Sequence, residues 1–226
     1  HRAGLPDGLF NIVTGRGVQV GDAISRSAKV AKISFTGSTA TGKTILRTAA
    51  DTFKRVTLEL GGKSPTLILP DADAPAAARL AVQAGFINSG QACIAGTRIL
   101  VPEARKAEFE HALAAEVEAQ HSGDPADAST TIGPMVNEKQ WQRVQHYIGL
   151  GEQEGARLLS GGPGRPGGLT HGWYIKPTLF SDVNSQMRIA REEIFGPVLS
   201  IISYRDEAEA IAIANDTEYG LSALVI

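Results

Sequence analysis

Apolar residues along the 226-residue chain alternate between short runs rich in β-branched side chains and longer stretches with helical spacing. The first four stretches predict a strand, a helix, a strand and a helix, at residues 10–14, 18–27, 31–36 and 38–53. Strands that are separated by helices pair in parallel through right-handed crossovers. The pattern therefore predicts an α/β protein with open sheets, each sheet being the middle of three layers.

The rest of the chain continues in the same manner. Further strands are predicted at residues 55–60, 65–69, 99–101, 174–180 and 198–204, and further helices at 73–88, from 102 onward, and at 137–151, 185–192 and 206–215. Phe109, Leu113 and Val117 recur every four residues, so they are expected to face a core. Glycine and proline between residues 161 and 168 indicate an exposed loop.

Two adjacent glycines, Gly61 and Gly62, separate two predicted strands, and the chain can pass there from one sheet to another. We therefore expect two domains, residues 1–62 and 63–226. The sequence starts at a turn signal near Gly4 and stops at Ile226 inside a predicted strand, which is unusual for a compact domain. We expect a fragment of a longer protein.

Composition narrows the class of protein. Lysine and arginine number 22 against 24 acidic residues, the net charge is -2, and no basic run stands out, so we expect no nucleic-acid or anionic membrane partner. No apolar stretch reaches the roughly 18 residues that a membrane helix needs. No leader pattern opens the chain and the single cysteine suits a reducing compartment, which favours the cytoplasm. The five histidines lack ligand spacing, and no metal site is expected.

Cys93 is the only cysteine, and small residues flank it on both sides in the string from Asn88 to Arg98. A lone thiol forms no internal disulfide, so its role is packing or chemistry. Free cysteines are most often buried and inert, and composition alone favours that interpretation. The other motifs of the chain decide between the two roles.

Residues Gly37 to Thr44 satisfy the pattern G-x-x-x-x-G-K-[ST] of phosphate-binding loops, between a predicted strand and a predicted helix. A helix N-terminus offers unpaired N–H groups and a positive dipole end, so it can hold a triphosphate or the pyrophosphate of a dinucleotide. A triphosphatase also needs a carboxylate for magnesium, and Asp71 is only a weak candidate. A P-loop-type nucleotide-binding protein is therefore one alternative.

Four strings change this balance: Phe35-Thr36-Gly37-Ser38-Thr39, Leu58-Glu59-Leu60-Gly61-Gly62-Lys63-Ser64-Pro65, the string around Cys93, and Glu192-Glu193-Ile194-Phe195-Gly196-Pro197-Val198. Their order and spacing, 34 residues from Glu59 to Cys93 and 100 from Cys93 to Glu193, resemble the aldehyde dehydrogenase superfamily. The resemblance covers essentially the whole chain. It implies that Gly37 and Gly42 belong to a Rossmann-like dinucleotide-binding fold with atypical glycine spacing, so the triphosphatase match is coincidental.

The resemblance implies an oxidoreductase that uses NAD or NADP on an aldehyde. Cys93 would be the nucleophile, forming a thiohemiacetal and then a thioester, and Glu59 would activate the water that releases the acid. Residues 1–62 would be the end of the cofactor domain, and residues 63–226 a truncated catalytic domain. The implied cofactor contacts are Thr36, Gly37, Ser38, Thr41, Gly42, Leu60, Glu193 and Phe195, with Gln140 and Arg143 as weaker matches near the ribose.

Members of this family are much longer than the chain, and the segment it lacks normally supplies an oxyanion-hole asparagine and the ligands of the adenosine ribose. Loss of one oxyanion donor costs on the order of 100-fold to 1000-fold in rate, so the fragment alone is expected to be inactive. NAD is the default cofactor, and Glu59 favours water over coenzyme A as acyl acceptor. The intact protein is expected to be a homodimer or homotetramer. A catalytically silent structural homologue is the second alternative.

Overall fold

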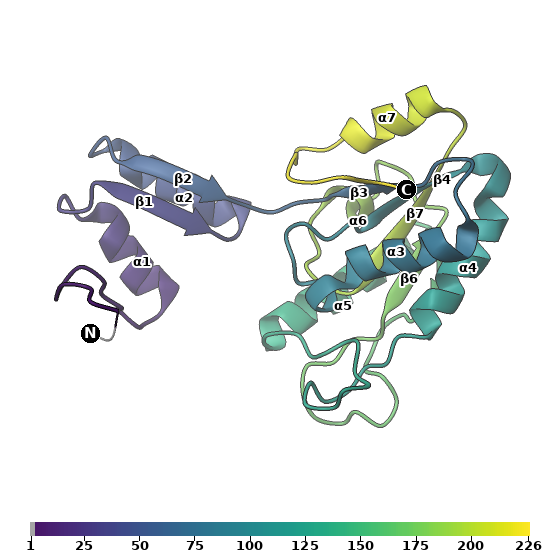
Figure 1. The fold of residues 1–226 in the computed structure, drawn as a ribbon, viewed down its shortest axis with the longest axis horizontal. Helices are drawn as coiled ribbons and strands as arrows, with labels where there is room; N and C mark the ends of the chain where they lie inside the picture. Colours follow the sequence, from purple (N-terminus) through teal and green to yellow (C-terminus); the bar gives the residue numbers. More distant parts are fainter. Residues whose placement is uncertain (1–2) are drawn as a thin grey trace. The chain divides into compact units, whose positions relative to one another are not determined.

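The structure, a computed structural model, describes residues 3–226. The chain forms two compact units, the first ending at Gly61 and the second running from Gly62 to Ile226. Figure 1 shows the elements of each unit in the colours of the sequence. This division lies one residue before the boundary expected after Gly62.

The described part of the first unit has two helices and two strands: α1 (Gly17–Arg26), β1 (Lys32–Thr36), α2 (Thr39–Ala50) and β2 (Arg55–Glu59). The strands pair in parallel, with Ile33 opposite Val56 and Thr36 opposite Glu59. Helix α2 connects the two strands and contacts both α1 and β2. The predicted order of strand, helix and strand is thus confirmed for residues 32–59.

The strand predicted at residues 10–14 is wrong. This segment is irregular, and Phe10 and Ile12 are 74% and 77% exposed. An alternation of apolar residues forms a strand only where a neighbouring strand pairs with it and a core covers it. Within the described residues this segment has neither.

The second unit contains six strands, five α-helices and two short 3-10 turns among the described residues. In chain order they are β3 (Pro65–Leu67), α3 (Ala74–Phe86), η1 (Ile87–Gly90), β4 (Arg98–Pro102), η2 (Glu103–Arg105), α4 (Lys106–Glu118), α5 (Glu138–Gln153), β5 (Arg157–Ser160), β6 (Thr178–Ser181), α6 (Arg188–Arg191), β7 (Val198–Tyr204), α7 (Glu207–Asn215) and β8 (Leu224–Val225).

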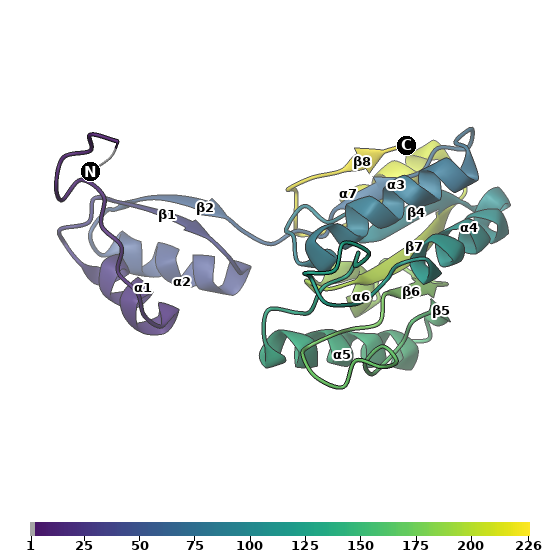
Figure 2. The same ribbon diagram turned by 60° about the horizontal axis from the view of Figure 1, so that its bottom comes forward.

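The six strands form one sheet in the order β5-β6-β7-β4-β3-β8. All neighbours are parallel except β5 and β6. Helices α3 and α4 lie on one side of this sheet and α5 and α6 on the other, as Figure 2 shows. Helix α7 packs on Leu100 and Tyr204, which point away from the α3 side. This arrangement confirms the three-layer α/β fold for the second unit.

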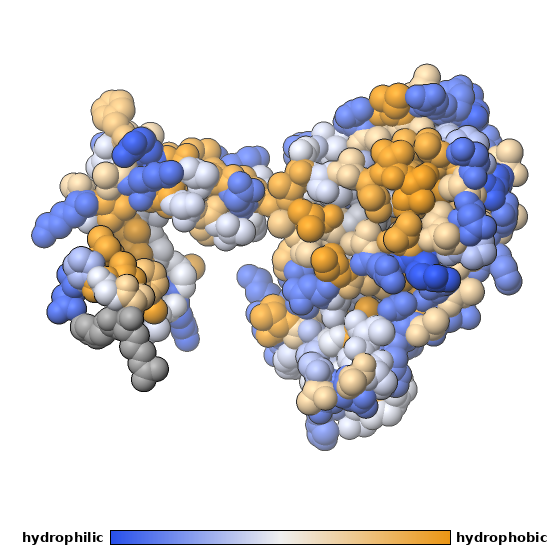
Figure 3. Space-filling view, in the orientation of Figure 1, coloured by the Kyte–Doolittle hydropathy of each residue, from blue (hydrophilic) through white to orange (hydrophobic). Residues whose placement is uncertain are grey.

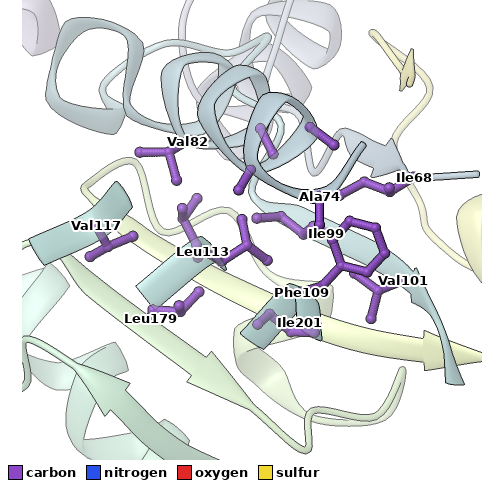
Figure 4. Close-up of a cluster of buried hydrophobic side chains, with 14 of the residues drawn as sticks. Ile68, Ala74, Val82, Ile99, Val101, Phe109, Leu113, Val117, Leu179 and Ile201 are labelled. Carbon is purple, nitrogen blue, oxygen red and sulfur yellow. The ribbon is translucent and has the colours of Figure 1, made fainter. Parts of the chain in front are cut away.

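Three clusters of buried apolar side chains hold the second unit together. In the largest, Figure 4 shows side chains of α3 and α4 packed against those of β4, β6 and β7. Phe109, Leu113 and Val117 of α4 are completely or almost completely buried, which confirms the face predicted from their spacing. Their burial contributes to the hydrophobic stabilisation on this side of the sheet.

Several element boundaries differ from prediction. Strand β6 begins at Thr178 rather than Tyr174, because Pro177 directly before it has no N–H for the ladder. Helix α6 begins at Arg188 rather than at residue 185, because the Asn184 side chain accepts a bond of 2.9 Å from the Gln186 N–H and forms a turn there. Strand β5 was not predicted, and its antiparallel pairing makes the sheet mixed.

The last strand, β8, pairs in parallel with β3 at an edge of the sheet. Leu224 and Val225 are 38% and 61% exposed. Figure 3 shows apolar side chains gathered on this part of the second unit. The strand expected at the end of the sequence is therefore present.

Candidate active site

The residues predicted to form the site lie in both units, and the structure brings them together in two groups. In the first unit, Thr36 and Glu59 are the last residues of β1 and β2, and they are register partners. The N–H of Gly37 donates to the Glu59 carbonyl over 3.0 Å. The two strands therefore end next to each other, and Glu59 lies at the same carboxyl end of the sheet as the turn into α2.

The turn into α2 is short, because Gly37 is followed directly by Ser38 as the N-cap residue. The Ser38 hydroxyl accepts from the Thr41 N–H over 3.3 Å and lies 2.9 Å from the Thr41 hydroxyl. Ser38 therefore satisfies one of the free donors of the first helical turn. The N–H groups of Thr39 and Ala40 lie in the first turn of α2, where the helix itself offers them no acceptor.

Gly42 lies where α2 passes closest to the segment after β2. A Cβ at this position would lie 2.6 Å from Cδ2 of Leu60, a distance that real contacts do not reach. The absent side chain lets Leu60 pack directly on the helix. Gly42, Leu60 and the Ser38 cap therefore form one compact corner of the first unit.

The phosphate-loop pattern of residues 37–44 does not form a phosphate loop. Such a loop wraps phosphates with free backbone N–H groups before its helix begins. Here residues from Thr39 onward are already helical, and the Gly42 N–H donates to the Ser38 carbonyl over 3.0 Å. The Thr44 hydroxyl donates to the Ala40 carbonyl over 3.2 Å. The triphosphatase alternative is therefore excluded for this segment.

The second group surrounds Cys93, which lies in a turn between η1 and β4 and is partly buried. Before it, Asn88, Ser89 and Gly90 all have positive φ angles, of 50°, 57° and 72°. Three successive left-handed residues turn the chain sharply away from α3. A Cβ at Gly90 would lie 2.2 Å from the carbonyl oxygen of Gly196, so only glycine fits there.

Gln91 anchors the same loop to a distant segment of the second unit. Its side chain donates to the Pro134 carbonyl over 3.4 Å and accepts from the Val136 N–H over 2.9 Å. The Ala95 N–H donates to the Ala92 carbonyl over 3.1 Å and closes a turn around Cys93. Backbone and side-chain bonds thus fix the position of the cysteine.

Gly62 connects the cysteine loop with Glu193. A Cβ on Gly62 would lie 2.2 Å from the Cys93 carbonyl oxygen. The Gly62 N–H donates to Oε1 of Glu193 over 3.1 Å. Gly62, Cys93 and Glu193 are therefore neighbours, although up to 131 residues separate them in sequence.

The loop from Glu193 to Phe195 is held by side chains of α5. Nε2 of Gln140 donates to the carbonyls of Ile194 and Phe195, over 3.0 and 2.8 Å. Arg143 donates to the Glu193 carbonyl over 2.5 Å. Phe195 has a φ of 63°, a conformation that a bulky side chain adopts only when its surroundings enforce it. Gln140 and Arg143 thus contact the backbone of this loop.

A small pocket of about 10 Å³ joins the two loops of the second unit. Its walls come from Gly62, Gly90, Ala92, Ala95, Thr97, Glu193, Ile194 and Phe195. Small side chains line it on the side of the cysteine loop. The pocket brings the predicted residues Glu193 and Phe195 next to the backbone that flanks Cys93.

Lys63, directly after Gly62, is an unusual neighbour of this group. Its side chain is 2% exposed, and its Nζ has no hydrogen-bond partner among the described residues. Burial lowers the pKa of Lys63 to about 7, the Arg98 guanidinium acts in the same direction, and the carboxylates of Glu193 and Glu192 oppose it. A lysine in this state can be neutral near neutral pH.

Residues 3–226 contain no group of three or more His, Cys, Asp or Glu side chains placed to hold a metal ion. Over the same residues, no helix is long and apolar enough to cross a membrane.

The sequence model of the aldehyde dehydrogenase family matches residues 1–226. The chain belongs to this family. Aldehyde dehydrogenase C from Pseudomonas syringae, solved with NAD+ and octanal, is 51% identical, with a TM-score of 0.97 over 99% of this chain and 46% of that chain. The Mycobacterium tuberculosis aldehyde dehydrogenase solved with NAD+ is 48% identical, with a TM-score of 0.96 over the same shares.

A Staphylococcus saprophyticus protein that is assigned by name to the aldehyde dehydrogenases is 49% identical over 224 residues, 99% of this chain and 47% of its own length. The chain thus spans about half the length of the curated relatives that it matches. The resemblance read from the four motifs is confirmed at the level of the family.

Two residues close to the candidate site, Lys63 and Tyr147, were not predicted as part of it. Lys63 belongs to one of the four motifs, but no local sequence pattern predicts that a lysine side chain is buried. Tyr147 was also missed, although it follows Gln140 and Arg143 on one face of α5. That spacing is a signal the sequence carries, but the contacts of Tyr147 with residues 143 and 192 depend on the tertiary fold.

Proposed function

We propose that the protein carrying this chain oxidises an aldehyde to a carboxylic acid with NAD or NADP, using Cys93 as nucleophile. The observation that carries the proposal is the contact of Gly62 with both the Cys93 backbone and the Glu193 carboxylate. In this way the second unit joins the only cysteine to a carboxylate that would bind the cofactor. The family membership and the relative solved with NAD+ and octanal support the same chemistry.

The residues of the first unit fit a dinucleotide. The helix N-terminus of α2 presents free N–H groups at Thr39 and Ala40 after a glycine turn, which suits the oxygens of a pyrophosphate. We infer that Gly37 and Ser38 contact this group, that Thr41 lies near the adenine, and that Gly42 permits close packing. Thr36 and Leu60 would approach the nicotinamide.

The residues of the second unit fit the ribose. One carboxylate oxygen of Glu193 accepts from Gly62, and the other is available to a ribose hydroxyl. Phe195 would pack beside the same part of the cofactor. Gln140 and Arg143 remain predicted to lie near the ribose. NAD is the expected cofactor, since the relatives from Pseudomonas and Mycobacterium hold NAD+.

The proposed reaction starts with the Cys93 thiolate, which forms a C–S bond to the aldehyde carbon while the carbonyl π electrons move to oxygen. NAD, when bound, would supply the acceptor for the hydride on this carbon. The carbonyl re-forms, and Cys93 is left as a thioester. Glu59 then takes a proton from a water whose oxygen attacks the thioester, and the C–S bond breaks to give the acid and the Cys93 thiolate. Glu59 returns to its charged form by releasing the proton to solvent.

The finer parts of the proposal concern the whole protein. Water rather than coenzyme A is the expected acyl acceptor, because Glu59 is present as a base. Residues 1–226 alone are expected to be inactive, since the first unit contributes only a two-stranded sheet to cofactor binding. A homodimer or homotetramer and a cytoplasmic location remain predictions.

The test is to incubate the whole protein with octanal and NAD+ and to follow NADH absorbance in the wild type and in Cys93→Ser. Turnover in the wild type and its loss in the variant support the proposal. A wild type that binds NAD+ without turnover would indicate a catalytically silent homologue instead. Turnover of octanal by residues 1–226 alone would contradict the proposed inactivity of the fragment.

A further inference from the structure

Tyr147 is a buried side chain of α5 that the proposed reaction does not use. It is 3% exposed and packs with Val144 and Ile148 in the core beneath the sheet. Its hydroxyl nevertheless has two polar partners: it donates to Oε2 of Glu192, and it receives a bond of 3.3 Å from Nη2 of Arg143. A tyrosine in this setting buries its ring and directs its hydroxyl to chosen partners.

Both partners of the Tyr147 hydroxyl are also directly connected to Glu193. Glu192 is its neighbour in the chain, and the same Nη2 of Arg143 donates to the Glu193 carbonyl over 2.5 Å. The Arg143 guanidinium also lies over the Tyr147 ring, 4.9 Å from its centre, a cation–π distance. Tyr147 thus orients Arg143 with its ring and its hydroxyl at once.

Glu192 is fixed from a second side. Arg188 donates to its carboxylate over 2.8 and 3.2 Å, and the Arg188 guanidinium lies 5.9 Å from the centre of the Tyr147 ring. The carboxylate therefore has bonds from α6 on one side and from α5 on the other. These bonds hold the Glu192 side chain in place. Because Glu193 is the next residue, its backbone orientation is restrained as well.

We propose that Tyr147 is a positioning residue of the cofactor site, which acts through Glu192 and Arg143 to aim the Glu193 carboxylate. The inference rests on the proposed function, because Glu193 is the group assigned to the ribose. A buried ring cannot reach the cofactor, so Tyr147 acts only through its partners. Its role differs in this from the direct ribose contacts predicted for Gln140 and Arg143.

Tyr204 provides a matched control in the same unit. It is also 3% exposed, its hydroxyl donates to the Ile68 carbonyl over 2.6 Å, and it packs in a separate apolar cluster with Leu100 and Ala210. Tyr147→Phe and Tyr204→Phe each remove one buried hydroxyl and keep the ring. Both variants are expected to lower the melting temperature, because each leaves a buried polar partner without its bond.

The experiment measures the Kd of NAD+ by calorimetry, and the KM values for NAD+ and octanal, in the whole protein. Tyr147→Phe is expected to raise the Kd and the KM for NAD+ about 2- to 30-fold, the range for residues that act through a neighbour, and to leave the KM for octanal unchanged. Tyr204→Phe is expected to change none of the three. Glu192→Gln, a partly exposed position, is expected to weaken NAD+ binding in the same direction.

A Tyr147→Phe protein with wild-type affinity for NAD+ and a lowered melting temperature would overturn the positioning role and leave the proposed function standing. If Tyr147→Phe does not fold, wild-type NAD+ affinity in Glu192→Gln overturns the inference in its place. A wild type that binds no NAD+ would overturn the proposed function, and the positioning role with it.

Discussion

At the scale of single residues, the backbone around Gly62 leaves no room for a side chain, since a Cβ there would lie 2.2 Å from the Cys93 carbonyl oxygen. Gly62→Ala must therefore displace the cysteine loop or the Glu193 contact. We expect at least a 10-fold loss of aldehyde oxidation and a loss of about 1–3 kcal/mol in the free energy of unfolding. Steady-state kinetics and urea unfolding measure the two effects.

Gly149, in the C-terminal half of α5, is the control for this substitution. A Cβ there would meet no atom within 4 Å. Gly149→Ala is expected to keep full activity and to stabilise the protein by about 0.5–1 kcal/mol, because alanine loses less backbone entropy in a helix. Equal activity of the two variants would show that the Gly62 contact has no bearing on the site.

Lys63 predicts a pH dependence of stability. Its pKa falls from 10.5 to about 7 in the folded state, through burial and Arg98, with Arg143 acting in the same direction and Glu193 and Glu192 opposing. Between these two pH values the unfolded chain binds a proton that the folded chain lacks, so stability contributed by this group rises with pH. Replacing Lys63 with an uncharged residue removes this increase of the free energy of unfolding with pH.

Lys63→Met is therefore expected to be more stable than the wild type at pH 7, by on the order of a few kcal/mol at about 1.36 kcal/mol for each pKa unit. The advantage should shrink towards pH 10. Urea unfolding at both pH values measures it, with the exposed Lys139→Met as control. A Lys63→Met protein that is less stable than the wild type at both pH values would mean that Nζ has a favourable partner.

The motifs of the sequence predict which residues carry reactive groups, but not which residues support them. Cys93, Glu59 and Glu193 stand in motifs whose order and spacing could be recognised. The burial of Lys63 and the bonds of Tyr147 depend on residues that lie far away in the chain. Such contacts depend on tertiary packing, which a local sequence pattern cannot predict.

At the scale of elements, Arg98 ties the start of β4 to two other segments. It is 1% exposed, and it donates to the carbonyls of Lys63, Ile213 and Ala214, each over 2.8 Å. Two of these carbonyls belong to the last turn of α7, where a cation is favourable. The side chain therefore links β4, the segment before β3 and α7.

Arg98→Met is expected to lower the free energy of unfolding by about 3 kcal/mol or more, because it leaves buried carbonyls without donors. Arg105→Met is the control, since Arg105 also donates to two carbonyls, of Pro70 and Ala72, but from a more exposed position. Its loss should cost about 1 kcal/mol. Similar losses for both variants would argue against the linking role of Arg98.

Element prediction succeeded where periodicity and burial agree. The four-residue spacing in α4 corresponds to a face that is buried in full. It failed at residues 10–14, where an apolar run has no partner strand among the described residues, and at β5, whose short strand depends on pairing with β6. Both failures concern pairing, which a strand cannot specify alone.

At the scale of the whole molecule, the two units differ in how much core they contain. All three clusters of buried apolar side chains lie in the second unit. The first unit has a two-stranded sheet, and Phe53 is 96% exposed. A two-stranded sheet with little core is marginal in water.

Residues 62–226 expressed alone are therefore expected to fold, with dispersed amide signals in NMR and cooperative thermal unfolding. Residues 1–61 alone are expected to give the narrow dispersion of an unfolded chain. Cooperative unfolding of the shorter piece would contradict this view of its core. The three-layer fold of the second unit could be predicted because most of its strands are followed by a helix along the sequence.

The central claim is that Cys93 carries the substrate as a thioester that Glu59 helps to release. The most direct test mixes Glu59→Gln whole protein with octanal and NAD+, quenches the reaction with acid, and locates added mass by peptide mass spectrometry. The account predicts an acyl group on the peptide that contains Cys93, accumulating in Glu59→Gln and absent in a Cys93→Ser control. NADH formation with no acyl group on Cys93 in Glu59→Gln, or turnover in Cys93→Ser, would contradict it.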